Sequence, residues 1–529
     1  MTISDAFHIY DTTLRDGAQQ EGLNLTVHDK LAIARHLDDL GVGFIEGGWP
    51  GANPKDTEFF KRAQTELKLK NAKFVAFGAT RRPNVKAADD VLLRALQDSG
   101  APVVTLVAKS HDRHVDLALK TNLDENLAMI KDSIEFLRTG GQRVFLDAEH
   151  FFDGYLSNKA YALEVIRVAM AAGADVAALC DTNGGMLPDQ LSDIVNEVIG
   201  STSARLGIHC HNDTGCAIAN SLAAVEAGAT HVQGTLNGYG ERTGNADLVA
   251  IIANLELKKK QKVLPDGALR EAFRISHAVA EVTNVAPSPR QPYVGVSAFA
   301  HKAGLHASAI KVDPALYQHE DPSSVGNDMR MLVSDMAGRA SIELKSQELG
   351  VALGDDKEVL TRVINRIKEM EAHGFTFEAA DASFELLLRE EIDSKRAHFF
   401  TIVNWETSVI RDSKDKVSSK ATVTINAQGK EIVATGSGNG PVNAIDTALR
   451  SGLEKIYPEM AKFELTDYKV RILEGRLGTG AITRVLVETS DGEKEWSTIG
   501  VHENVIAASA MALEDAVTYG LLRLGRKPE

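Results

Sequence analysis

Short apolar runs rich in Val, Ile, Phe and Leu recur along the first half of the chain, and amphipathic stretches separate them. Runs of about four to eight residues bounded by turn residues are typical of buried parallel strands. The stretches between them, such as HDKLAIARHLDDLG from His28, have helical periodicity and end in glycine, where a C-cap belongs. The eight predicted strands begin at Phe7, Gly43, Phe74, Val103, Val144, Val176, Leu206 and His231.

Eight strand–helix units within about 260 residues match the number and spacing of a (β/α)8, or TIM, barrel. An open, doubly wound α/β sheet is the alternative, but eight units exceed its usual count. We therefore expect a catalytic barrel over residues 1–270. The strand–helix rhythm then stops, and charged helical runs with a Pro-rich break at APSPRQP, residues 286–292, predict a helical subdomain or linker over residues 271–403.

A second pattern begins after a charged link, RDSKDKVSSK, at residues 411–420. KATVTINAQGKEIVATG is typical of a hairpin and GNGPVNAIDTALRSGL of a helix behind it; ITRVLVETSDGEKEWSTIG and ENVIAASAMALEDAVTYG repeat the two. We expect a C-terminal α/β domain, residues 404–529, of two strand–strand–helix repeats with a small effector bound at their junction. A shift of 64 residues aligns Gly436 with Gly500, Val442 with Ile506, and Leu449 with Leu513.

Composition narrows the classes of function. The chain has 529 residues and a net charge of -15, which argues against nucleic acid or an anionic membrane as a partner. Its three cysteines, Cys180, Cys210 and Cys216, have no zinc-type spacing, so neither a structural zinc nor a disulfide framework is expected. We see no leader and no run approaching the roughly 18 apolar residues that span a bilayer, and we expect a cytoplasmic protein.

Polar residues gather where the predicted strands end, which is where a barrel carries its chemistry. His209 and His211 are two apart on a strand, so both side chains face the same side. With the Asp16 carboxylate and the Asn245 amide they form a mixed N/O set that suits Mn²⁺, Mg²⁺, Co²⁺ or Zn²⁺. Two structural histidines are the alternative, but NDTG directly afterwards and GERTGNA one strand later favour a metal site.

Four other strand-end residues have the chemistry to bind a substrate. Arg15 suits a carboxylate or a developing enolate oxygen, unless it forms only a surface ion pair with Asp16. Glu149 is a candidate acid or base with Asp147 on the same strand face, although a strand-end carboxylate can also be merely solvated. The Thr182 hydroxyl is a possible donor to a bound carboxylate.

Two long stretches resemble a known family. LRDGAQQEG from Leu14 and IHCHNDTGCAIANSLAAVEAGATHVQGTLNGYGERTGNADL from Ile208 resemble the motifs of the 2-isopropylmalate, homocitrate and citramalate synthases, which are metal-dependent acyl-CoA condensing barrels. EGGWPGANPKD, VGNDMRMLVSDMAGRA and WSTIGVHENVIAAS, which start at Glu46, Val325 and Trp496, look most like the citramalate synthase branch.

The resemblance implies a Claisen-type condensation of acetyl-CoA with pyruvate to (R)-citramalate and CoA. It also implies isoleucine as the feedback effector, and a homodimer in which His306 of AGLHASA reaches the active site of the neighbouring subunit. Glu149 and His306 are both candidates for the base. The implied metal ligands are Asp16, His209, His211 and Asn245; the implied catalytic residues are Arg15, Glu149 and His306; the implied substrate-binding residues are Arg15, Gln19, Asp147 and Thr182.

Other functions remain open at this stage. A 2-isopropylmalate synthase, using 2-oxoisovalerate, or a homocitrate synthase would differ only in the pocket. A metal-dependent lyase of the same barrel would not need the C-terminal repeats. A non-catalytic amino-acid sensor is disfavoured because Arg15, Asp16, His209 and His211 are all present.

Overall fold

The computed structural model describes residues 5–353, 357–473, 478 and 480–528. The chain divides into two compact units. The first comprises residues 1–299 and 320–328, and the second comprises residues 300–319 and 329–529.

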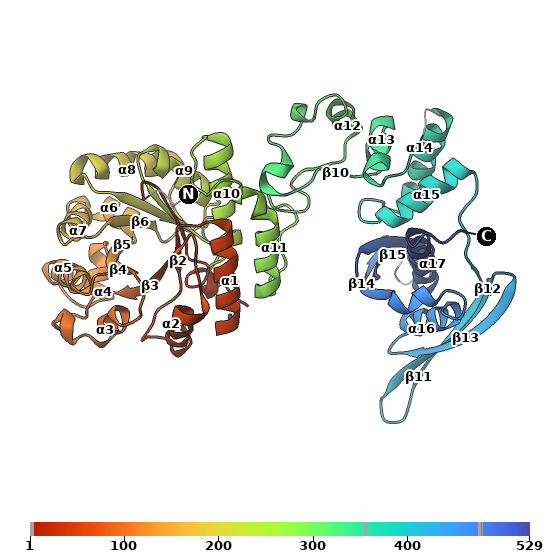
Figure 1. The fold of residues 1–529 in the computed structure, drawn as a ribbon, viewed down its shortest axis with the longest axis horizontal. Helices are drawn as coiled ribbons and strands as arrows, with labels where there is room; N and C mark the ends of the chain where they lie inside the picture. The colour runs from red at the N-terminus through yellow and green to blue at the C-terminus, as the bar shows by residue number, and fades with distance from the viewer. Residues whose placement is uncertain (1–4, 354–356, 474–477, 479, 529) are drawn as a thin grey trace. The chain divides into compact units, whose positions relative to one another are not determined.

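The first unit is built on a closed barrel of eight parallel strands (Figure 1). The first and last strands pair with each other, His8 opposite His231, so the barrel has no open edge. This confirms the predicted barrel and excludes the open sheet. The strands are β1 (His8–Asp11), β2 (Phe44–Glu46), β3 (Lys73–Ala79), β4 (Val103–Lys109), β5 (Arg143–Glu149), β6 (Val176–Asp181), β7 (Leu206–Cys210) and β8 (His231–Gly234).

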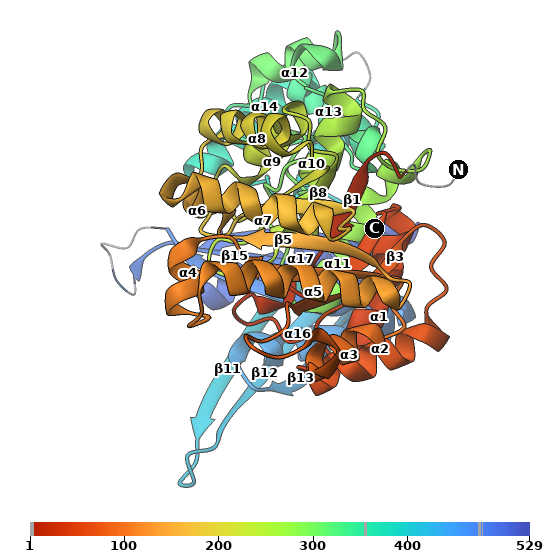
Figure 2. The same ribbon diagram turned by 90° about the vertical axis from the view of Figure 1, so that its left-hand side faces the viewer.

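Helices surround the barrel, and their apolar faces and the outward-facing strand residues form one large core. Figure 2 shows α5 and α7 on either side of β5, and both helices contact that strand. The helices of this unit are α1 (Val27–Leu40), α2 (Pro54–Glu66), α3 (Val91–Gln97), α4 (Asp112–Leu117), α5 (Leu123–Thr139), α6 (Phe151–Ser157), α7 (Lys159–Ala171), α8 (Pro188–Thr202), α9 (Ala217–Glu226), α10 (Leu248–Ala253) and α11 (Ala272–Thr283).

Rings fill the end of the barrel where the strands begin. Phe44 and Phe145 pack edge to face, with centroids 5.2 Å apart, and both lie against His8 and His231. Gly207 leaves the space for His231, because a Cβ there would lie 2.7 Å from its ring. Burial lowers the pKa of His8 to about 4 and lowers that of His231 as well, so both rings are uncharged at neutral pH. The barrel is therefore sealed at this end, and only its other end is available for chemistry.

The second unit begins with short elements and three longer helices. Strands β9 (Ala300–His301) and β10 (Arg330–Met331) form a two-stranded parallel sheet. The helices are α12 (Gly304–Ile310), α13 (Arg339–Glu348), α14 (Lys357–Ala372) and α15 (Asp381–Asp393), and the last three share an apolar core.

Two repeats complete this unit, as predicted, but each contains three strands rather than two. The additional strands are exposed along most of their length, so they lack the alternation of apolar and polar residues that reveals a strand in sequence. The predicted charged link is a hairpin, in which Arg411 pairs with Val417. The repeats are β11 (Thr401–Arg411), β12 (Val417–Ala427), β13 (Lys430–Gly438) and α16 (Pro441–Leu453), then β14 (Glu464–Ile472), β15 (Thr483–Ser490), β16 (Glu495–His502) and α17 (Val505–Arg523).

The 64-residue offset between the repeats is a structural equivalence. A Cβ on Gly436 would lie 2.4 Å from the carbonyl oxygen of Ala444, and a Cβ on Gly500 would lie 1.9 Å from that of Ala508. Both glycines therefore allow a helix to approach its own sheet closely. Leu449 and the equivalent Leu513 are buried in the shared core of the two repeats.

Helix α17 bears on the expectation that no segment is long and apolar enough to span a bilayer. Among the described residues it is the one helix long and apolar enough, by length and composition, to cross a membrane. More than half of its most apolar window is buried inside the unit, where it packs on β15 and β16. It also carries Glu514 and Asp515. We interpret it as a core helix of the repeat domain.

Asp38 offers a test of the barrel packing. Its buried carboxylate, near the end of α1, accepts hydrogen bonds from the backbone N–H groups of Lys70, Asn71 and Ala72, which lead into β3. Asp38→Ala leaves these donors without their acceptor, so we expect the thermal midpoint of the barrel unit to fall by about 4–10 °C. Calorimetry of the full chain measures it. The exposed neighbour provides the control: Asp39→Ala should shift the midpoint by less than about 2 °C, and equal shifts would contradict this account.

Candidate active site

A cavity of about 520 Å³ opens where the barrel strands end. Eight of the residues singled out in the sequence line it, and they come from β1, β5, β6 and β7 or from the loops that follow these strands. These are Arg15, Asp16, Gln19, Asp147, Glu149, Thr182, His209 and His211.

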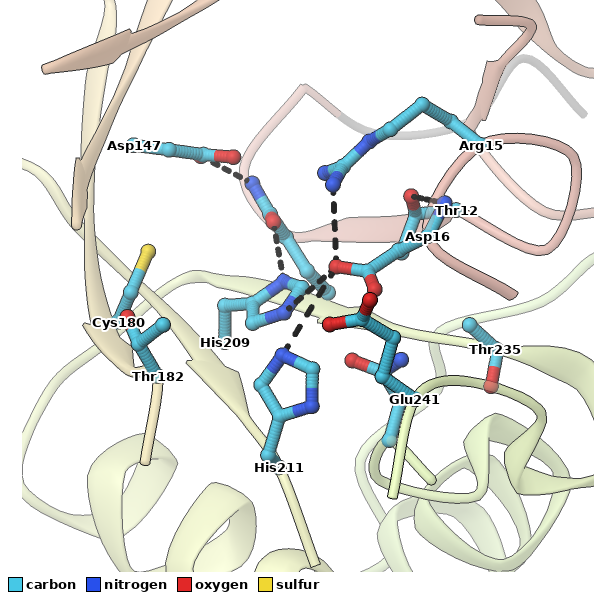
Figure 3. Close-up of polar contacts among 12 residues, drawn as sticks. Thr12, Arg15, Asp16, Asp147, Cys180, Thr182, His209, His211, Thr235 and Glu241 are labelled. Carbon is cyan, nitrogen blue, oxygen red and sulfur yellow. Dashed lines mark hydrogen bonds and ion pairs between the residues drawn. The ribbon is translucent and has the colours of Figure 1, made fainter. Parts of the chain in front are cut away.

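Three buried side chains meet in this cavity (Figure 3). Oδ2 of Asp16 lies 3.3 Å from Nε2 of His209 and 3.9 Å from Nε2 of His211. The turn after β1 sets the position of Asp16, because its N–H and those of its two neighbours all donate to the Thr12 carbonyl. One carboxylate oxygen and two imidazole nitrogens therefore converge on one point, which is a ligand set suited to a divalent metal.

Asn245 lies beside this cluster, where it forms a β-bridge with His211. Its Nδ2 donates to the carbonyl of Tyr239 at 3.1 Å, so the amide oxygen faces the other way. This buried oxygen has no hydrogen-bond partner among the described residues. Gly240, with φ +150°, makes the arrangement possible because a Cβ there would lie 2.3 Å from Nδ2 of Asn245. An orphaned buried acceptor is a reason to expect a cation here.

The protonation states also favour a cation. Burial opposes ionisation of Asp16, but Arg15 and the two histidines outweigh it and lower the pKa of the carboxyl group. Burial, together with His209, lowers the pKa of His211 to about 4. Burial also disfavours the charged form of His209, yet Asp16 raises its pKa overall, so a proton and a metal would compete for this ring.

A buried network holds Arg15. Its Nε donates to Oε2 of Glu46 at 2.6 Å, its Nη1 lies 3.1 Å from Oδ2 of Asp16, and its guanidinium stacks 3.8 Å above the ring of Phe77. Glu46 also accepts hydrogen bonds from Tyr10 at 2.5 Å and from Thr12. Arg15 is thus no surface ion pair, since Asp16 and Glu46 are both buried.

The candidate acid and the candidate hydroxyl donor each have one close partner. Glu149 forms an ion pair with Lys109, its neighbour in register on β4, and both line the cavity. The Thr182 hydroxyl accepts the backbone N–H of His150 at 2.8 Å, which leaves its own proton to donate. Gln19, which is exposed, lies at the mouth.

His306 belongs to the other compact unit. It lies on α12 and stacks on Tyr317, with ring centroids 4.0 Å apart.

Sequence reasoning gave no role to three residues of the site. Glu46 was named only as the first residue of the EGGWPGANPKD motif, and neither Lys109 nor Gln233 was predicted. Gln233 links His209 to Asp147 through two hydrogen bonds, of 2.8 and 2.7 Å. The period-two alternation of strands places all three inside the barrel, and that signal was available. It does not say what a polar side chain inside a barrel binds.

Family models match three parts of the chain. The model described as HMGL-like matches residues 6–279, the model of the homocitrate synthase post-HMGL domain matches residues 293–374, and that of the LeuA allosteric (dimerisation) domain matches residues 378–521.

Full-length relatives narrow the family further. An (R)-citramalate synthase of Streptomyces coelicolor is 65% identical over 99% of this chain and 98% of its own length. An (R)-citramalate synthase of Aquifex aeolicus is 47% identical over 98% of this chain and 99% of its own. A 2-isopropylmalate synthase of Methanocaldococcus jannaschii is 31% identical over 98% of this chain and 95% of its own. The chain therefore belongs to the HMGL-like family, in the branch that the (R)-citramalate synthases occupy.

Proposed function

We propose that this chain condenses acetyl-CoA with pyruvate to give (R)-citramalate and CoA, and that the reaction serves isoleucine biosynthesis. The observation that carries the proposal is the guanidinium of Arg15 beside the cluster of Asp16, His209 and His211. Such a site can bind the carboxylate and keto oxygens of a 2-oxo acid while a second substrate approaches. The full-length relatives at 47–65% identity support pyruvate as the acceptor.

Asp16, His209, His211 and Asn245 would hold a divalent metal, and the orphaned oxygen of Asn245 supports this set. When bound, the metal would supply Lewis-acid polarisation of the keto group. Mn²⁺, Mg²⁺, Co²⁺ and Zn²⁺ all accept such ligands.

Arg15 and Thr182 would orient the 2-oxo acid. The network around Glu46 fixes the Arg15 guanidinium before any substrate arrives, so its positive charge is in place for the alkoxide that forms at C2. Thr182 can donate its hydroxyl proton to the substrate carboxylate, because its oxygen already accepts from His150. Gln19 and Asp147 complete the proposed substrate contacts.

Glu149 is our candidate for the base because it lines the same cavity. Its carboxylate would take a proton from the acetyl methyl group, and the electron pair of that C–H bond would form the new bond to C2 of pyruvate. The keto oxygen would gain the negative charge and then a proton. Water would next cleave the thioester, releasing CoA as a thiol and leaving the second carboxylate of citramalate.

We also propose a homodimer, in which His306 acts at the neighbouring subunit's active site. The match to the LeuA allosteric (dimerisation) domain supports two-subunit assembly. His306 itself rests on the resemblance of AGLHASA to the family motif.

Isoleucine is our candidate effector of the repeat domain. A cavity of about 700 Å³ lies where α16 begins, and it is lined by Pro441 and Val442 of the first repeat and by Leu465 of the second. Asp446, Arg450 and Tyr468 also line it, so it offers charged and aromatic groups for an amino acid. Its position in the repeat domain supports a regulatory role.

The first prediction from the proposed function concerns the metal. In the full chain, His211→Ala should weaken Mn²⁺ binding by more than about 100-fold, because a direct ligand is lost and not an outer-shell partner. Equilibrium dialysis with elemental analysis measures the binding. His28→Ala, at an exposed histidine, is the matched control and should bind like the parent. Unchanged binding by a folded His211→Ala protein would remove His211 from the site.

The second prediction concerns the 2-oxo acid. Each extra methylene is worth about 10–200-fold in such a pocket, so we expect kcat/KM for pyruvate to exceed that for 2-oxoisovalerate by about 100-fold or more. Release of the CoA thiol, followed with a thiol reagent, measures both. 2-Oxoglutarate should also be a poor substrate. A higher kcat/KM with 2-oxoisovalerate would assign the chain to the 2-isopropylmalate synthases.

The third prediction concerns regulation. Isoleucine should inhibit the intact enzyme, with a coupling of about 1–3 kcal/mol between effector and substrate, or about 5–150-fold in affinity. Leucine at the same concentration is the control and should have little effect. Calorimetric titration together with the CoA-release assay separates binding from inhibition. Inhibition by leucine alone would refute both the effector and the pathway.

A further inference from the structure

Gln233 lies beside His209, which forms a cluster with Asp16 and His211. It is fully buried on β8, in register with His209 on β7, and strand alternation turns both side chains into the barrel. It is not among the residues that line the cavity in the described part of the chain. Gln233 can therefore act only through its neighbours.

The side chain of Gln233 makes two hydrogen bonds that run in a defined direction. Oε1 of Gln233 lies 2.8 Å from Nδ1 of His209, and Nε2 of Gln233 donates to Oδ1 of Asp147 at 2.7 Å. Asp147 and His209, the partners of these two hydrogen bonds, are both buried. Figure 3 labels both residues and draws the hydrogen bonds as dashed lines. Because Oδ1 of Asp147 accepts from the Nε2 group of Gln233, the amide oxygen of Gln233 faces the histidine.

The direction of these two hydrogen bonds determines the tautomer of His209. The amide oxygen of Gln233 accepts, so the hydrogen of the neutral imidazole must be on Nδ1. Nε2 then carries a lone pair, and Nε2 is the atom that faces Asp16. A metal needs that lone pair.

We infer that Gln233, with its amide oriented by Asp147, is a positioning residue that keeps Nε2 of His209 available to bind the metal. This inference rests on the metal site proposed above. It gives Asp147 a role in addition to its proposed contact with substrate. The two hydrogen bonds do for His209 what a direct carboxylate–histidine pair does at other metal sites.

The test compares Mn²⁺ binding to the metal-free full chain, without substrate, by the paramagnetic resonance signal of free Mn²⁺. Gln233→Leu keeps the size of the side chain but removes the acceptor, so we expect the dissociation constant to rise by about 10–100-fold. Gln142→Leu is the matched control. Gln142 is also buried, but it binds the carbonyls of Leu96 and Ala101, and its loss should leave Mn²⁺ binding unchanged.

A double variant tests the direction of the two hydrogen bonds that Gln233 makes. In Gln233→Glu/Asp147→Asn the Asn amide donates to the Glu carboxylate, and that carboxylate still accepts from Nδ1 of His209. We expect Mn²⁺ affinity to return to within about threefold of the parent, because the two substitutions compensate at neighbouring positions. A merely structural role would not predict this recovery.

If Gln233→Leu fails to fold, Gln233→Met, also apolar and more adaptable, replaces it.

The outcomes separate the two proposals. If the parent chain does not bind Mn²⁺, the proposed metal site is wrong. If the parent binds it and the folded Gln233→Leu or Gln233→Met protein binds equally well, only the role of Gln233 is wrong. Failure of the double variant to recover would also overturn that role.

Discussion

The arrangement of the site depends on one guanidinium, that of Arg15, whose side chain is only 14% exposed. Arg15 lies between Glu46, which has no exposed surface, and Asp16, which has almost none. A carboxylate inside a barrel is tolerated only with a partner and with its remaining lone pairs satisfied. Glu46 meets both conditions through Arg15, Tyr10 and Thr12. One cation thus compensates two anions, and the remaining negative charge lies beside His209 and His211, where a divalent cation would neutralise it.

The hydrogen-bonded network around Glu46 also contributes to the stability of the barrel. Tyr10 also contacts Thr105 at 2.7 Å, so the polar layer joins β1, β2 and β4 across the barrel. Removing one partner of a buried ion pair costs about 3–5 kcal/mol, because the other charge is left uncompensated. Substitutions at Arg15 or Glu46 would therefore lower stability as well as activity. His211 differs from these two residues, because it is not part of the hydrogen-bonded network around Glu46.

Much of the barrel was predictable because parallel strands buried on both faces are continuous apolar runs, and all eight were found. The exposed strands β11 and β14 were not, since too few of their residues are buried to give a repeating apolar face. In the site, the spacing of His209 and His211 and the motif around Asp16 predicted the cluster. Glu46, Lys109 and Gln233 were missed because their partners lie on other strands, and no local pattern records a contact between residues far apart in sequence.

The repeats show how a small residue can be required by packing and not by backbone conformation. Gly436 and Gly500 are strand residues whose absent side chains let α16 and α17 lie against their sheets. Any side chain there would meet helix backbone, which cannot move aside as a flexible side chain can. The same offset then places Leu449 and Leu513 in one core. A helix held this closely passes a small displacement at its N-terminus to its sheet, because packed interiors transmit strain. A cavity at the start of α16 is therefore well placed for a ligand to be sensed by the whole repeat.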